Sequence, residues 1–261
     1  MKIKLYQLDA FAEQLFSGNP AAVCPLPYWL PDNLLQAIAA ENNLSETAFL
    51  VPQGDDFRLR WFTPVREVSL CGHATLAAAY VVFQFLKPAT DQVVFHTLSG
   101  ALRVTQKGSL LTMQFPALSA EQVTVSGLLV EALGVTPVAV YRSLDYMLVL
   151  ASESQVRDLR PDLARLLQLD LRGVVVTAPG EQYDFVSRYF APKLAIPEDP
   201  VTGSTHCVLA PYWGKRLGKD RLCAKQLSAR GGVVLCELQD DTVALTGNVI
   251  PYLLGEITLP D

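Results

Sequence analysis

Arg60-Trp61-Phe62-Thr63-Pro64 recurs later in the chain as Arg188-Tyr189-Phe190-Ala191-Pro192. Each copy is followed by a loop and then by an apolar segment that starts at a glycine, Gly72 in the first case and Gly203 in the second. Two further pairs follow the same order, Leu98-Ser99-Gly100 with Leu227-Ser228-Ala229 and Pro31-Asp32 with Pro161-Asp162. One such pair is common by chance in a globular chain, but four collinear pairs spaced by 128 to 131 positions indicate an internal repeat.

The repeat predicts two similar α+β domains, residues 1–118 and 119–261, with the boundary near Pro116-Ala117-Leu118-Ser119. Within them, residues 31–42 and 161–169 begin with Pro-Asp and carry apolar residues at helical spacing, so each is expected to form an amphipathic helix. The segment from Ala74 to Phe83 is instead apolar on every side, and such a helix must be enclosed. We therefore expect two pseudo-symmetric domains, each a β-sheet wrapped around one central helix.

Composition excludes several classes of partner. The 261 residues carry a formal net charge of −5 and no run of Lys or Arg, so neither nucleic acid nor an anionic membrane surface is an expected partner. The apolar stretch from Leu70 to Leu86 is too short and too polar to span a bilayer. The first residues alternate in polarity and lack the apolar run of a signal peptide, which predicts a cytoplasmic protein. Five cysteines without a CxxC pair suit reduced thiols.

The starts of the two central helices are candidate binding sites. The first backbone N–H groups of a helix have no partner within it, and the helix dipole attracts an anion to that end. Gly72-His73 and Gly203-Ser204 occupy these two starts. If the two halves face each other about a pseudo-twofold axis, both starts point into one cleft between the domains, which would bind a small carboxylate.

Three side chains are candidates for proton transfer at that cleft. Glu46 stands just before an apolar strand, where shielding from water would raise the pKa of its carboxyl group toward general acid/base use. His73 follows the glycine that starts the first central helix, and Asp199 precedes the start of the second by a few residues. Each residue also has a structural explanation: a Glu at a turn is often solvated, Asp before Pro forms turns, and His near a helix start can cap it.

Metal and cofactor sites are not expected. Cys71, His73, His206 and Cys207 are residue types that bind metals, but His206 and Cys207 are adjacent on a predicted helix and do not share a face. The chain has neither the GxGxxG nor the GxxxxGK[ST] pattern of nucleotide-binding loops. The sequence therefore predicts no metal and no cofactor.

Several motifs, in order along the chain, resemble those of the PhzF family of phenazine-biosynthesis-like isomerases. They are Asp9-Ala10-Phe11 with Phe16-Ser17-Gly18-Asn19-Pro20-Ala21-Ala22-Val23, Leu44-Ser45-Glu46-Thr47-Ala48-Phe49, Arg60 to Pro64, Cys71-Gly72-His73-Ala74-Thr75 and Asp199-Pro200-Val201-Thr202-Gly203-Ser204. The resemblance implies a diaminopimelate epimerase-like fold of two pseudo-symmetric halves with a cofactor-free site between them. It also implies a homodimer.

The resemblance further implies a reaction and the residues that perform it. The characterised phenazine enzyme of the family shifts a proton on a dihydro-hydroxyanthranilate with a Glu, a His and an Asp, which correspond to Glu46, His73 and Asp199. Ser45, Gly72, Gly203 and Ser204 are then expected to bind the substrate, with the two glycines and Ser204 holding its carboxylate.

Two alternatives stay open from the sequence. Related amino-acid epimerases use two facing cysteines, one at each helix start, and this chain has Cys71 but no cysteine from Asp199 to Gly203. A one-thiol or Glu-based epimerase is the second interpretation, although Cys71 is more simply a small apolar residue. The third is a binding protein that holds a small acid without converting it.

Overall fold

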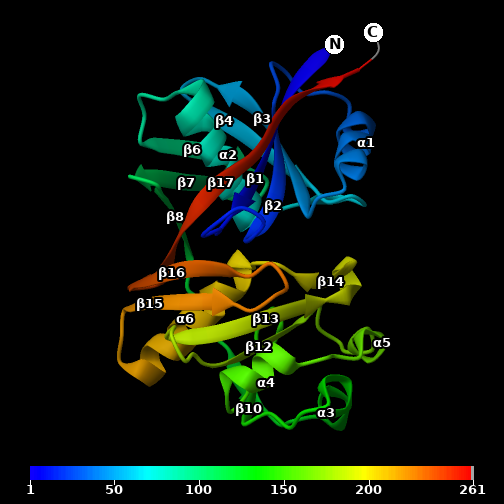
Figure 1. Cartoon of the computed structure of the whole chain (residues 1–261), viewed down its shortest axis with the longest axis vertical. Coiled ribbons are helices and arrows are strands. Elements are labelled where there is room, and N and C mark those ends of the chain that lie inside the picture. The colour runs from blue at the N-terminus through cyan, green and yellow to red at the C-terminus, as the bar shows by residue number, and fades with distance from the viewer. Residues whose placement is uncertain (260–261) are drawn as a thin grey trace. The chain divides into compact units, whose positions relative to one another are not determined.

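The computed structural model describes residues 1–259, which form two compact units (Figure 1). Unit 1 contains residues 1–114 and the C-terminal segment from Thr246 onward, and unit 2 contains residues 115–245. The first crossing lies close to the expected boundary, but the last segment does not stay in the second half as expected. Strand β17 (Thr242–Thr258) pairs antiparallel with β1 (Lys2–Ala10) from Val249 to Thr258, and this ladder of backbone hydrogen bonds places it in unit 1.

Unit 1 is built on one sheet whose remaining strands are β2 (Asn19–Pro25), β3 (Glu46–Gln53), β4 (Asp56–Phe62), β5 (Glu67–Val68), β6 (Gln92–Thr97), β7 (Gly100–Lys107) and β8 (Leu110–Pro116). β1 pairs antiparallel with β2, β2 parallel with β3, β3 antiparallel with β4, β4 parallel with β6, and β6 antiparallel with β7. β7 pairs antiparallel with β8, and β5 with the end of β4. Helix α1 (Asp32–Asn42) connects the parallel strands β2 and β3.

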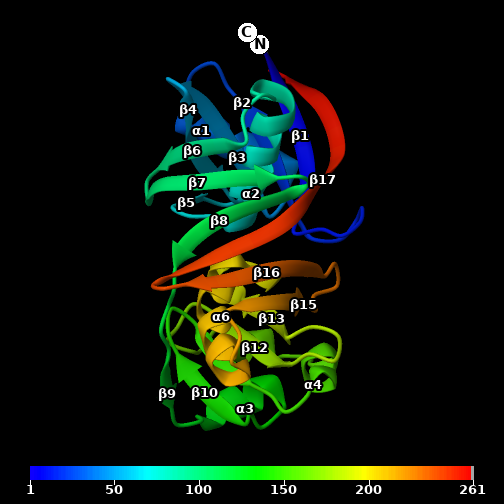
Figure 2. The same ribbon diagram turned by 90° about the vertical axis from the view of Figure 1, so that its left-hand side faces the viewer.

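Helix α2 (Gly72–Val81) is the core of unit 1, and Figure 2 shows it enclosed by strands of that unit. It packs against β1, β2 and β3 and continues into a short π-helical turn, η1 (Val82–Leu86). Only Gly72 and Tyr80 of the ten α2 residues are not fully buried. The apolar sequence on every side of this helix therefore predicted its enclosure correctly.

Unit 2 repeats the strand order of unit 1. Its strands are β9 (Glu121–Val123), β10 (Ala139–Arg142), β11 (Tyr146–Val149), β12 (Val174–Pro179), β13 (Phe185–Ala191), β14 (Ile196–Asp199), β15 (Arg221–Gln226) and β16 (Gly232–Gln239). β10 pairs antiparallel with β11 and β9, β11 parallel with β12, β12 antiparallel with β13, β13 parallel with β15, and β15 antiparallel with β16. This is the order of β1, β2, β3, β4, β6 and β7.

The helices of unit 2 are α3 (Gly127–Leu133), α4 (Glu153–Asp158), α5 (Leu163–Leu166) and α6 (Gly203–Leu217), with a 3-10 turn η2 (Pro192–Leu194) before β14. α6 follows β14 and packs against β15 and β16, as the central helix of its unit. The amphipathic helix expected over residues 161–169 is shorter in the structure: Asp162 caps its start, and the helix ends after one turn, at Leu166. Among residues 1–259, no helix is both long and apolar enough to span a bilayer.

The register of the strands shows which single residues of the two units correspond to each other. Thr47 of β3 lies opposite Phe62 of β4, and Val174 of β12 lies opposite Phe190 of β13. Because Phe62 and Phe190 are equivalent in the repeated motif, Thr47 corresponds to Val174. Glu46 then corresponds to Gly173.

Candidate active site

Glu46 and His73 meet inside unit 1. Glu46 is the first residue of β3 and follows a turn that leaves α1 through Asn43, which has left-handed backbone angles. His73 is the second residue of α2. Both side chains are buried, and Oε2 of Glu46 lies 3.0 Å from Nε2 of His73. Neither of these two atoms has a partner elsewhere in the protein, so a buried acid and a buried imidazole face each other at ion-pair distance.

Cys71 adjoins the other side of the imidazole. Its Sγ lies 3.5 Å from Nδ1 of His73. Burial, assisted by the Glu46 carboxylate, raises the pKa of the Cys71 thiol to about 11, so the thiol is neutral near pH 7. Burial by itself lowers the pKa of His73, but the Cys71 sulfur and the Glu46 carboxylate outweigh it, and the pKa of His73 is raised. The histidine is therefore a proton donor held beside a carboxylate.

The same three residues raise the question of a metal ion, because one ligand atom from each lies within 4.8 Å of the others. The cysteine, however, approaches Nδ1 while the carboxylate approaches Nε2. These nitrogens point away from each other on one ring, so a single ion cannot use the contacts that the structure has. A chain of proton-carrying groups fits this arrangement better than a metal site.

Asp199 lies in unit 2, at the end of β14, and is buried. It accepts a hydrogen bond from Oγ1 of Thr202, the residue just before α6. Gln226 holds both residues: its Nε2 donates to the Asp199 carbonyl at 2.7 Å and its Oε1 accepts the Thr202 N–H at 2.9 Å. The carboxylate is thus fixed beside the start of α6.

The expected site residues fall into two groups. Ser45, Glu46, Gly72 and His73 lie in unit 1, at the start of β3 and the start of α2. Asp199, Gly203 and Ser204 lie in unit 2, around the start of α6. Ser45, Gly72 and Ser204 are partly exposed, whereas the other four are buried.

A serine anchors the loop before each central helix. Oγ of Ser99 donates to the carbonyl of Ser69 at 2.7 Å, and Oγ of Ser228 donates to the carbonyl of Pro200 at 2.7 Å. These are the serines of the repeated Leu-Ser pairs. Their role at the helix starts was missed from the sequence, although their equivalent places in the repeat were visible there.

An arginine fork holds each of the short strands that precede the helices. Arg60 bonds Glu67 of β5 through Nε and Nη2, both at 2.7 Å. Arg188 bonds Glu198 of β14 in the same way, at 2.7 and 3.0 Å. Two parallel bonds from a planar guanidinium fix direction as well as distance. The arginine of the repeated motif therefore positions Asp199, the neighbour of Glu198, and the chain that leads to Cys71.

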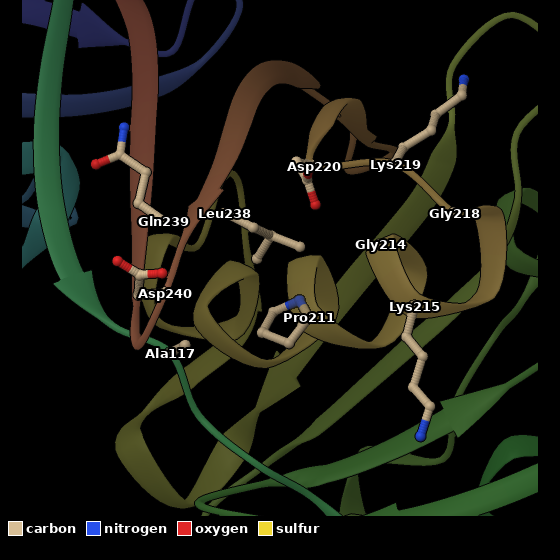
Figure 3. Close-up of a pocket in the computed structure, with 10 residues that line it drawn as sticks. All are labelled: Ala117, Pro211, Gly214, Lys215, Gly218, Lys219, Asp220, Leu238, Gln239 and Asp240. Carbon is tan, nitrogen blue, oxygen red and sulfur yellow. The ribbon is translucent and has the colours of Figure 1, made fainter.

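A separate hollow of about 760 Å³ lies in unit 2 beside the second half of α6. Figure 3 shows the ammonium groups of Lys215 and Lys219 pointing away from each other and out of the hollow. It contains none of the expected site residues and no converging set of charged groups. We therefore do not assign chemistry to it.

Comparison with known proteins identifies the family. The family model for phenazine biosynthesis-like proteins matches residues 8–252. An uncharacterized isomerase of Pseudomonas aeruginosa is 50% identical over 259 residues, which cover 99% of this chain and 100% of that protein. The chain belongs to the PhzF family. The resemblance found in the motifs is confirmed, and the motifs that contain Glu46, His73 and Asp199 lie at the start of β3, at the start of α2 and just before α6.

Solved structures confirm the mixed α+β fold expected of a PhzF-family chain. A PhzF-family phenazine biosynthesis protein of Enterococcus faecalis has a TM-score of 0.97 at 47% identity, covering 99% of this chain and 100% of that one. A hydroxyproline epimerase of Agrobacterium vitis has a TM-score of 0.64 at 11% identity, with 100% and 93% covered. At that identity the epimerase shows a shared fold only.

Proposed function

We propose that the protein is a cofactor-independent isomerase that moves a proton at carbon in a small carboxylate-bearing substrate. The observation that carries the proposal is the buried pair of Glu46 and His73, whose facing atoms are 3.0 Å apart and have no partner elsewhere in the protein. A buried acid and a buried imidazole that have only each other as partners are costly to keep in a protein that only needs to fold. The relatives named as isomerases support the same class of activity.

In this proposal Glu46 is the base that removes or returns the proton at carbon. Proton abstraction from carbon leaves negative charge on the substrate, and His73, with its raised pKa, is suited to stabilise that charge or to donate a proton. Asp199, fixed by Thr202 and Gln226, positions the substrate. Ser45 contributes a further hydroxyl group to substrate binding.

The substrate carboxylate is proposed to bind at the two helix starts, Gly72-His73 and Gly203-Ser204, in a cleft formed by both units. Neither helix has a side-chain cap on its first N–H groups. Uncapped N–H groups at the positive end of a helix dipole favour an anion. No metal or organic cofactor takes part in the proposed steps.

The decisive experiment is Glu46→Gln, which keeps the shape and hydrogen-bonding capacity of the side chain but removes its ionisable group. Small carboxylic acids, including dihydro-hydroxyanthranilate and cyclic amino acids, are incubated with the protein in D₂O, and conversion is followed by NMR. We expect a substrate to be converted by the wild type, and the variant to bind it but turn over about a hundredfold more slowly or worse. A variant with the wild-type rate would refute the proposal.

Two alternatives have definite signatures in the same screen. An amino-acid epimerase would invert the α-carbon of an amino acid, and Cys71 at the start of α2 is the residue that favours it. Against it, Thr202 stands where a second thiol would be, and burial keeps Cys71 protonated. A binding protein would shift the NMR signals of an acid and never change it.

The cellular setting is also a proposal. We propose a cytoplasmic homodimer whose partners are small molecules rather than nucleic acid or membrane, in keeping with the net charge of −5. Light scattering on the eluted protein should give twice the 28.6 kDa mass of the chain. A mass of one chain across micromolar concentrations would exclude the dimer.

A further inference from the structure

Cys71 stands beside the proposed catalytic pair without a role in the proposed reaction. It is the residue just before α2, its side chain is buried, and it makes no capping bond to the helix. Its Sγ lies 3.5 Å from Nδ1 of His73. We propose that Cys71 is a positioning residue, which accepts a hydrogen bond from Nδ1–H of His73 and thereby keeps Nε2 aimed at Glu46 and the substrate.

The backbone at the start of α2 explains why a side chain, and not a backbone carbonyl, accepts the Nδ1–H of His73. An imidazole is commonly oriented by a carbonyl that accepts its Nδ1–H, and in α6 the carbonyl of Thr202 does so for His206, at 2.7 Å. At the start of α2 the equivalent carbonyl, that of Cys71, already accepts from Oγ1 of Thr75 at 2.5 Å and from its N–H at 3.2 Å. Thr75 thus takes in α2 the place that His206 has in α6, and the acceptor that lies next to Nδ1 of His73 is the sulfur of Cys71.

The sulfur suits a histidine that gains and loses a proton at Nε2. With the imidazole protonated, Nδ1–H donates to sulfur and Nε2–H faces the Glu46 carboxylate. When Nε2 gives up its proton to the substrate or to Glu46, the neutral ring still carries Nδ1–H and keeps the same bond to sulfur. Since the burial of Cys71 keeps the thiol neutral, no step requires a thiolate, and the sulfur forms no covalent bond to the substrate.

The other titratable groups near α2 are already engaged. On β1, the carboxylate of Asp9 accepts the N–H of Phe16 at 3.2 Å. On β2, Cys24 is packed in the apolar cluster under α1. The charged group that faces His73 is therefore Glu46, from β3, and its other polar neighbour is the neutral sulfur of Cys71, from its own helix start.

The test is histidine titration by NMR, which needs no substrate because the chain has three histidines. Protein with isotope-labelled histidine is compared as wild type, Cys71→Ala and Cys71→Ser, with Cys24→Ala as a buried-thiol control in the same unit. We expect Cys71→Ala to lower the pKa of His73 and to abolish its preference for the Nδ1–H tautomer. In Cys71→Ser the hydroxyl restores an acceptor, but its C–O bond is shorter than the C–S bond, so the pKa of His73 should lie between those of Cys71→Ala and the wild type. Cys24→Ala should match the wild type.

The inference rests on the proposed function, but the two fail separately. A Glu46→Gln protein with wild-type turnover refutes the function and leaves the titration result standing. With a substrate in hand, Cys71→Ala should lower kcat about ten- to a hundredfold at similar KM, with partial recovery in Cys71→Ser.

Two results would overturn the role of Cys71. One is a His73 titration and tautomer in Cys71→Ala that match the wild type. The other is a Cys71→Ser protein as inactive as Cys71→Ala with an unchanged His73 titration, which would make the thiol itself the proton carrier. If Cys71→Ala does not fold, the titration of Cys71→Ser decides, since the weaker contact must still move the pKa of His73.

Discussion

The starts of α2 and α6 share one scaffold and differ in their chemistry. In both, an arginine fork holds the short strand before the helix, Arg60 to Glu67 and Arg188 to Glu198. In both, a serine hydroxyl binds a carbonyl of the connecting loop. The repeat therefore preserves the groups that set where each helix begins, because both units need their central helix in the same place.

The difference lies in the side chains that surround the helix start. Glu46 in unit 1 corresponds in register to Gly173 in unit 2, and a Cβ at Gly173 would lie 2.7 Å from the hydroxyl of Tyr189. The tyrosine hydroxyl takes the space next to Gly173 and bonds to Asp145 at 3.0 Å. A repeated fold can therefore hold the buried Glu46 and His73 pair in one unit while the equivalent place in the other unit is filled.

Replacing the two fork arginines should change the free energy of unfolding more than the other substitutions below, and should change it more for Arg188 than for Arg60. Arg188 is buried and also donates to the carbonyls of Val156 and Leu159, so Arg188→Met leaves several buried groups without partners and should cost about 3–5 kcal/mol. The Arg60 side chain is 20% exposed, and Arg60→Met should cost about 1–2 kcal/mol. Urea unfolding measures both, and equal losses would contradict the asymmetry.

A loss of stability on acidification should come from α6, because the pKa of His206 is lowered, whereas the pKa of His73 in α2 is raised and its contribution to stability is lost only as the pH rises. His206 is buried and neutral, and burial lowers its pKa from 6.5 to about 4, whereas Thr75 at the equivalent place in α2 does not titrate. The folded state resists protonation that the unfolded state accepts, so stability is complete above about pH 6.5 and falls as the pH drops toward 4. The loss is roughly 3 kcal/mol.

Urea unfolding between pH 7.5 and 4.5 measures this loss in the wild type and in His206→Gln. The glutamine removes the titrating group, so the variant should lose less stability on acidification than the wild type. Parallel pH profiles in the two proteins would show that His206 does not contribute.

A methyl group at the position that corresponds to Glu46 should show the smallest effect. Gly173→Ala places Cβ against the Tyr189 hydroxyl at 2.7 Å and the Phe190 carbonyl at 2.9 Å, and should cost about 1–3 kcal/mol. Gly127→Ala is the matched control in unit 2, since its Cβ meets nothing within 4 Å and alanine favours a helix. Thermal unfolding compares them, and equal melting temperatures would mean that unit 2 has room for a side chain there.

Several features could be predicted from the sequence because they depend on local patterns. The glycine-started apolar segments predicted both central helices, since a helix without a polar face has to be enclosed. The repeat predicted two similar units, and the PhzF motifs pointed to Glu46 and His73. The extent of the second unit was not predictable, because the pairing of β17 with β1 joins residues at opposite ends of the chain.

The sequence by itself determined which residues are proposed for proton transfer: an acid at the start of β3, a histidine at the second position of α2 and an aspartate before α6. Tertiary structure alone decided which groups each of these side chains contacts, and therefore the pKa of His73. Glu46 and Cys71 flank the two nitrogens of His73 only because β3 and the start of α2 meet in the folded unit. Periodicity reports which face of an element is buried, but a hydrogen bond depends on distances of a few tenths of an ångström between elements, and only the packed fold sets those.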